Sequence, residues 1–116
     1  MELRDDDTFT IDELVSLYDS VGWSLYTRDP GALARAIANS THVVSARVAS
    51  DLVGLARCVS DDVSIVYVQD LLVRPDHQRQ GIGRALLARC LARYAHVRQT
   101  VLLTDDHPHP QRLYRA

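Results

Sequence analysis

Apolar residues recur at every third or fourth position in the first third of the chain. The helical repeat is carried by Ile11, Leu14, Val15, Tyr18 and Val21. Thr10 and Glu13 have the spacing of a capping box just ahead of it, so the pattern predicts an amphipathic helix from residue 10 to Gly22. Asp29 followed by Pro30 is typical of an N-cap and a first helical position, and it predicts a second helix to about residue 39.

Two other segments of this region lack the helical repeat. Residues 1–9 are predicted to give a short first strand. Residues 21–26 are predicted to form a loop that carries Trp23 and Tyr26. These two aromatic side chains either plug the core or form the wall of a substrate pocket, and the sequence leaves both readings open.

From residue 42 onward the period changes to two, which indicates strands. Val44 and Ala46 fall on one face, while Ser45 and Arg47 fall on the other. Turn-forming residues at 50–51 and 60–62 then divide the pattern. They predict three antiparallel strands, over residues 42–48, 52–59 and 63–73.

The last part of the pattern predicts a helix over residues 81–96 and a further apolar strand over 97–104. Because a helix connects it to strand 63–73, the new strand should run parallel to that one. The buried arc of the helix is expected to hold Leu86, Leu87, Cys90, Leu91 and Tyr94. With no internal repeat or linker visible, residues 1–116 are predicted to form one α/β (α+β) domain with a mixed sheet and helices on its faces.

Composition narrows the classes of partner. A net charge of −2 and a pI near 6.2 argue against nucleic acid or an anionic membrane as the main partner. No apolar run approaches the roughly 20 residues that span a bilayer, and the acidic residues 5–7 are unlike a signal peptide. Cys58 and Cys90 are expected to be buried thiols. We therefore expect a cytoplasmic protein.

A glycine loop between the predicted strand 63–73 and the predicted helix 81–96 carries the most specific chemistry. Pro75 stops the strand, and Gly81 and Gly83 open the helix, whose first turn offers unpaired N–H groups to an anion. Glycine lets the backbone approach a ligand closely, and Arg79 and Arg84 add positive charge. This arrangement predicts a phosphate site. The alternative is that the glycines only let a loop enter a helix.

Other phosphate-binding loops fit less well. A nucleotide P-loop would need Lys followed by Ser or Thr, and a dinucleotide fingerprint would need a third glycine and a distal acidic residue. Neither is present in this segment.

The order Gln78-x-x-Gly81-x-Gly83, after a strand and before a helix, resembles the acyl-CoA loop of the GNAT superfamily of acetyl-CoA-dependent N-acetyltransferases, Arg/Gln-x-x-Gly-x-Gly/Ala. Residues 67–73 are similar to the strand of spermidine/spermine acetyltransferases that precedes their CoA-binding segment. The resemblance implies a GNAT-like fold, in which antiparallel strands are followed by a strand-helix-strand crossover that binds CoA. Gln69 stands where the amine acetyltransferases have glutamate, so polyamine binding does not follow.

The resemblance also implies a set of site residues. The backbone of Leu71, Leu72 and Val73 would pair with the pantetheine of acetyl-CoA. The pyrophosphate would be held by Gln78, Arg79, Gln80, Gly81, Ile82, Gly83 and Arg84. No metal site is predicted, because His107 and His109 lack a third ligand at useful spacing.

For catalysis, the resemblance implies direct attack of an amine on the thioester, with help from a proton donor. Leu113-Tyr114 resembles the Leu/Phe-Tyr pair of the family, whose tyrosine approaches the CoA sulfur as general acid. The alternative is that Tyr114 is a helix residue that packs on the sheet. Asp70 is predicted to bind the ammonium or relay its proton through water, or else to hold loop amides. Arg57, His42 and Tyr67 are weaker candidates for the acceptor cleft.

Family members continue past this tyrosine into two further strands, whereas this sequence stops at Ala116. We therefore expect a C-terminally short fold with a last helix of about two turns, and an apolar edge at strand 97–104 that a second copy covers in a homodimer. The predicted function is an N-acetyltransferase that uses acetyl-CoA and a primary amine of a small molecule or protein. The alternative is a catalytically impaired acyl-CoA-binding or dimerisation module.

Overall fold

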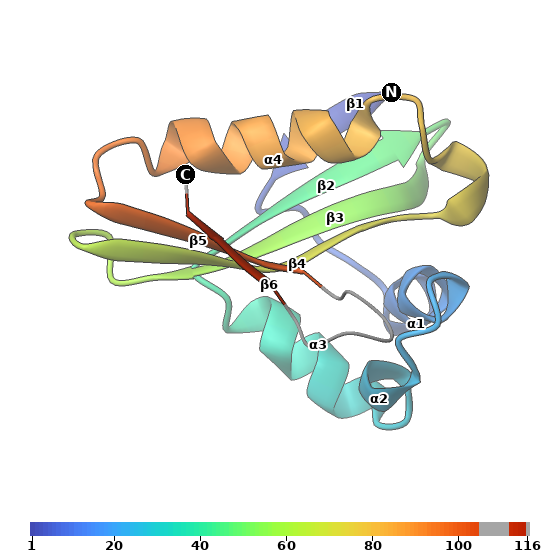
Figure 1. The fold of residues 1–116 in the computed structure, drawn as a ribbon. Coiled ribbons are helices and arrows are strands. Elements are labelled where there is room, and N and C mark those ends of the chain that lie inside the picture. Colours follow the sequence, from blue (N-terminus) through green and yellow to red (C-terminus); the bar gives the residue numbers. More distant parts are fainter. Residues whose placement is uncertain (105–111, 116) are drawn as a thin grey trace.

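The structure, a computed structural model, describes residues 1–104 and 112–115. It holds a six-stranded mixed sheet in the order β1-β2-β3-β4-β5-β6, with α4 on one face and α1, α2 and α3 toward the other (Figure 1). The elements are β1 (Glu2–Asp5), α1 (Ile11–Ser20), α2 (Ser24–Thr27), α3 (Pro30–Ala38), β2 (His42–Val48), β3 (Asp51–Ser60), β4 (Ile65–Val73), the 3-10 turn η1 (Pro75–His77), α4 (Ile82–Arg93), β5 (Gln99–Thr104) and β6 (Arg112–Arg115). All neighbouring strands are antiparallel except β4 and β5, which are parallel and joined through α4, as predicted.

The two N-terminal helices begin where their capping signals predict. The Thr10 hydroxyl accepts from the Glu13 amide at 3.1 Å, and the Glu13 carboxylate accepts from the Thr10 amide at 2.8 Å. The Asp29 side chain caps α3 by accepting from the Ala32 amide at 3.1 Å. Together α1 and α3 cover one face of the sheet with an apolar layer of Leu14, Leu17, Tyr18, Leu33 and Ile37.

The opposite face is covered by α4. Its buried residues Ile82, Leu86 and Cys90, together with the C-cap residue Tyr94, pack on apolar side chains of β2, β3 and β4. Gly54 of β3 lies directly beneath this helix, where an added Cβ would meet Leu86 Cδ1 at 3.1 Å. Cys58 and Cys90 are free and buried, as expected from the sequence.

A β-bulge in β4 shapes the middle of the sheet. Arg57 of β3 pairs with Asp70, but the next residue of β3 pairs with Val68. Gln69 therefore has no partner on β3, and an extra residue of this kind bends a strand and changes its twist. The parallel pairing of β4 with β5 also ends at Val68. Within the described residues, the part of β4 after the bulge has no strand partner on its β5 side.

The bulge also decides which face each later side chain of β4 takes. Before it, Val66 and Val68 pack beneath α4, and after it Leu71 and Val73 do so. Leu72 instead joins the layer beneath α1 and α3. A shift of one residue exchanges the two faces of a strand, so a regular β4 would have placed these residues the other way round.

Two expectations about local structure were wrong. The helix α2 overlaps the predicted loop 21–26 and ends one residue beyond it, because the chain turns once more before Asp29 caps α3. Arg112–Arg115 form a strand, β6, in place of a helix of about two turns. Unpaired N–H and C=O groups along an apolar edge favour such pairing.

The strand β6 also changes the picture of the sheet edge. It pairs antiparallel with β5 from Val101 to Thr104, so β5 is not the open edge that the sequence led us to expect. A second copy of the chain therefore finds no open β5 edge to cover. Among the helices that the structure describes, none has both the length and the apolar content that a bilayer span requires.

Candidate functional site

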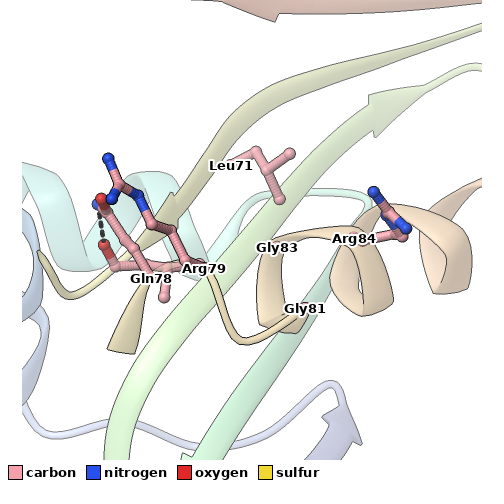
Figure 2. A pocket seen from close by; sticks show the side chains of 7 residues that line it. Leu71, Gln78, Arg79, Gly81, Gly83 and Arg84 are labelled. Atoms are coloured by element: carbon pink, nitrogen blue, oxygen red, sulfur yellow. Dashed lines mark hydrogen bonds between the residues drawn. The ribbon is translucent and has the colours of Figure 1, made fainter. Parts of the chain in front are cut away.

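An open hollow of about 610 Å³ lies between the end of β4 and the beginning of α4 (Figure 2). It is lined by Leu71, Val73, Gln78, Arg79, Gly81, Gly83 and Arg84. All seven belong to the predicted cofactor site. The fold thus brings the end of the predicted CoA-binding strand and the glycine loop to one place.

The N-terminus of α4 opens into this hollow without a side-chain cap among the described residues. Its N-cap residue is Gly81, whose φ of 84° lies in the left-handed region that favours glycine. The first amides of a helix lack intrahelical acceptors, and they lie at the positive end of the helix dipole. The arrangement suits an anion.

The two glycines keep the approach to these amides open. A Cβ at Gly81 would meet nothing within 4 Å, and one at Gly83 would meet only Val73 Cγ2, at an ordinary 3.6 Å. Close packing within the chain therefore does not require glycine at either position. The space left by the missing Cβ atoms belongs to the hollow, since both glycines line it.

Polar side chains border the glycines. In Figure 2, Arg79 and Arg84 lie on either side of them, and both arginines are exposed. The Gln78 side-chain amide donates to the Val73 carbonyl at 3.0 Å (dashed line in Figure 2), which ties the loop to the end of β4. Arg79 itself has a positive φ of 64°, an uncommon conformation for a residue with a side chain.

The other three predicted cofactor residues do not line the hollow with their side chains. Leu72 is buried beneath α1 and α3, and Ile82 is buried beneath α4. Gln80 is exposed in the loop. Each of them contributes backbone to the two segments that border the hollow, and their roles in binding stay predictions.

Asp70 lies just after the bulge, on the face opposite α4, and is 3% exposed. Its Oδ2 atom accepts from Arg57 Nε at 2.7 Å and from the Tyr18 hydroxyl at 2.9 Å. Its Oδ1 atom accepts from the Tyr26 hydroxyl at 2.9 Å. Burial and the negative charge of Asp70 raise the pKa of Tyr18 and of Tyr26, so both phenols stay protonated and act as donors.

Sequence reasoning missed most of this network. Arg57 was a weak candidate for the acceptor cleft and proves to be the ion-pair partner of Asp70. Tyr18 was treated only as part of a helical repeat, and Tyr26 as a loop aromatic. No local signal joins these residues, since Tyr18 and Tyr26 lie 52 and 44 positions from Asp70.

The remaining candidates lie apart from one another. His42 is buried beneath α4, where its Nε2 atom lies 3.0 Å from Asp5 Oδ1, so it does not share the face of Asp70. Tyr67 is 39% exposed on β4. The backbone of Tyr114 lies in β6 opposite Leu102, and its side chain lies outside the described residues, as do His107 and His109. No group of three metal-ligating side chains occurs in the described part of the chain.

Known proteins that match this chain in sequence are acetyltransferases. The model of the acetyltransferase (GNAT) domain matches residues 22–116. An uncharacterised N-acetyltransferase of Gracilaria tenuistipitata is 32% identical over 99 residues, covering 80% of this chain and 53% of that protein. A histone acetyltransferase of Glycine max is 32% identical over 90 residues, covering 68% of this chain and 38% of that protein. This chain thus spans about two fifths to half the length of these two curated relatives.

Solved structures agree in fold. A GNAT-family acetyltransferase of Streptococcus pneumoniae superposes with a TM-score of 0.77 at 32% identity, covering 92% of this chain and 77% of that one. An aminoglycoside 6'-N-acetyltransferase complexed with coenzyme A superposes with a TM-score of 0.79 at 20% identity, covering 94% of this chain and 64% of that one. At 20% identity, the likeness to the aminoglycoside acetyltransferase concerns the fold alone.

Proposed function

This chain belongs to the GNAT acetyltransferase family, and on that premise we propose that it transfers the acetyl group of acetyl-CoA to a primary amine. The amine belongs to a small molecule or to a protein. The single observation that carries the proposal is the hollow at the N-terminus of α4, where Gly81 and Gly83 leave room beside unpaired amides and two arginines.

The residues of this hollow fit the two polar parts of acetyl-CoA. The amides at Gly81, Ile82, Gly83 and Arg84 would hold the pyrophosphate, and the arginines would add charge that water screens only in part. The β4 backbone at residues 71–73 would pair with the pantetheine amides as an added strand does. When bound, acetyl-CoA supplies an activated thioester carbonyl.

The transfer itself needs positioning and a proton donor. An unprotonated amine held against the carbonyl can attack directly, and holding the two partners together supplies much of the rate. We assign the donor role to Tyr114. The backbone register supports this, because Tyr114 pairs with Leu102, and Leu102 pairs with Val68, next to the bulge.

A second candidate is an acyl-CoA-binding or dimerisation module that lacks transfer activity. It is favoured by one observation, namely that the acidic candidate Asp70 is already engaged by three donors. A cytoplasmic location is part of the proposal in either case, whereas the pairing of β6 with β5 removes the open edge that a homodimer would have covered. The net charge of −2 supports partners other than nucleic acid or an anionic membrane.

Two measurements test the proposal. The first is CoA binding by calorimetry in Arg84→Ala, with Arg93→Ala as a control on the same helix, since Arg93 lies at the far end of α4. We expect only Arg84→Ala to weaken binding, by about tenfold, as for a hydrogen bond to a charged group. Equal affinities in both variants would contradict the assigned phosphate site.

The second measurement is thiol release from acetyl-CoA over a panel of amines. Tyr114→Phe should lower kcat by about 100-fold or more, the range of general acid catalysis. Tyr94→Phe is the control, because the Tyr94 hydroxyl is buried beneath α4 and has no hydrogen-bond partner among the described residues. CoA binding without transfer to any amine would support the second candidate.

A further inference from the structure

Asp70 joins four elements of the fold at one carboxylate. The residue itself belongs to β4, while its three donors come from α1 (Tyr18), α2 (Tyr26) and β3 (Arg57). Arg57 also donates from Nη2 to the Tyr26 hydroxyl at 3.4 Å, which closes a ring of contacts. Such a network restrains every member more than a single pair would.

The helix α2 has little else to hold it. It has only four residues, none of them buried, and no side chain caps its N-terminus in the described structure. Leu25, at its centre, is 77% exposed. Its described polar side-chain contacts to other elements are few. They run from Tyr26 to Asp70 and Arg57, and from Thr27 to Asp19 of α1.

Aromatic packing makes the position of α2 depend on Tyr26. The Tyr26 ring lies 5.0 Å from the Tyr18 ring and 6.1 Å from the Trp23 ring, while Tyr18 and Trp23 are 5.9 Å apart. These three rings form an aromatic wall. Tyr18 is buried, whereas Trp23 and Tyr26 remain half-buried and reach the surface.

The wall is attached at a particular point of β4. Asp70 follows the bulged residue Gln69 and precedes Leu71, which lines the hollow for the cosubstrate. At Asp70 the strand has also left its pairing with β5, which ends at Val68. The carboxylate therefore connects the aromatic wall with the strand segment that borders the cosubstrate.

We propose that Asp70 is a positioning residue, which clamps α2 and its aromatic wall to β4 and so fixes one side of the space where the acceptor enters. This rests on the proposed function only in calling the space an acceptor site. The clamp itself is a statement about the free protein.

The geometry favours this role over proton transfer by Asp70. Only 3% of the residue is exposed, and both carboxylate oxygens accept hydrogen bonds. Tyr26 is half-buried and therefore lies nearer to the surface than the carboxylate of Asp70.

Hydrogen exchange in the free protein tests the clamp. The amides to follow are those of Tyr26, which donates to Trp23, and Arg28, which donates to Ser24. In Tyr26→Phe and in Asp70→Asn they should exchange about tenfold faster, the effect of losing a hydrogen bond to a charged group. Tyr94→Phe, the matched control on the other face, should leave them unchanged.

Kinetics with acetyl-CoA and the best amine add an independent readout. Tyr26→Phe should raise the acceptor KM by about tenfold, and the shape of the pH profile of kcat should stay unchanged. In the double variant with Asp70→Asn, the effects of the two substitutions on the acceptor KM should not add up, because both break the same contact. Amide exchange rates in Tyr26→Phe that equal those of the wild type would overturn the proposal. A kcat lost only in Asp70→Asn, with a changed pH profile, would also overturn it and assign proton transfer to Asp70.

The two proposals can fail separately. If no amine is acetylated, the proposed function fails, and the exchange rates of the free protein still decide the clamp. If Asp70→Asn does not fold because Arg57 is left buried without its partner, Tyr26→Phe, which keeps that ion pair, decides it alone.

Discussion

The side-chain amide of Gln78 donates to the main-chain carbonyl of Val73 at 3.0 Å and so closes the loop between β4 and α4. The two residues are five positions apart, and both line the hollow. The bond fixes the loop that carries the glycines relative to the strand that carries Leu71. A cosubstrate that touches both segments needs this relative position.

Gln78→Ala should therefore weaken CoA binding with little effect on folding. A neutral hydrogen bond contributes about 0.5–1.5 kcal/mol, so we expect an affinity reduced by about three- to tenfold. Gln80→Ala is the matched control, since it keeps the main chain that Gln80 contributes to the predicted site and removes only an exposed side chain that does not line the hollow. Calorimetric titration with CoA measures both, and equal losses in the two variants would contradict the role of the bond.

Gly81→Ala should combine backbone strain with a loss of CoA affinity. The left-handed conformation costs a residue with a Cβ about 1–2 kcal/mol, so the free energy of unfolding should fall by that amount. Gly22→Ala has the same strain at a φ of 80°, away from the hollow, with nothing within 4 Å of its Cβ. Urea denaturation should show similar losses of the free energy of unfolding in both variants, whereas CoA binding should weaken in Gly81→Ala alone.

Gly54→Ala tests how closely α4 packs on β3. The new Cβ would lie 3.1 Å from Leu86 Cδ1 and 3.3 Å from the Leu72 carbonyl oxygen, which belongs to the backbone. Overpacking of this kind costs about 1–3 kcal/mol in the free energy of unfolding. Gly31→Ala is the control, because its Cβ would meet only side-chain atoms at contact distance, Arg35 Nη1 at 3.4 Å and Asp29 Oδ1 at 3.7 Å. Alanine within α3 should stabilise by up to about 1 kcal/mol, measured by the same denaturation.

Arg47 should make stability depend on acid pH. Hydrogen bonds from its guanidinium hold the pKa of Glu13 below the ordinary value. Burial raises the pKa of Asp7, but hydrogen bonds from Arg47 and Ser45 outweigh it and the pKa is lowered. Lowered carboxyl pKa values stabilise the fold above the unfolded values near 4, and this contribution is lost as the pH falls through the folded values.

At pH 7, Arg47→Met should destabilise by about 3–5 kcal/mol, because it leaves the buried carboxylate of Asp7 and the part-buried carboxylate of Glu13 without their partner. The difference from the wild type should begin to shrink as the pH falls below about 4, where the carboxylates of the unfolded chain become neutral, and should vanish below the lowered pKa values of the folded protein. Arg93→Met, which removes an exposed pair with Asp62, should cost less than about 1 kcal/mol at either pH. Denaturation curves at pH 7 and pH 3.5 measure this difference, and a difference of the same size at both pH values would contradict the network.

Local signals were enough to predict most of the elements. The Thr10 capping box, the Asp29 cap and the alternation after residue 42 each depend on neighbours within a few positions, and the corresponding helices and strands begin where these signals lie. The glycine loop was readable for the same reason, since its strand, turn and helix follow one another directly along the chain.

Contacts between distant segments were not readable in this way. The bulge at Gln69 depends on how β3 and β4 align, and no residue within β4 predicts it. The strand β6 forms because β5 offers it hydrogen-bonding groups, whereas Leu113-Tyr114 alone had suggested a helix.

The sequence by itself thus determined the family, the crossover around α4 and the glycines that open its N-terminus, because each is encoded in a short, continuous stretch. Only the tertiary structure decided the surroundings of Asp70. Its partners Tyr18 and Tyr26 come from helices 52 and 44 positions away, and a carboxylate acquires its role from the donors that folding brings to it.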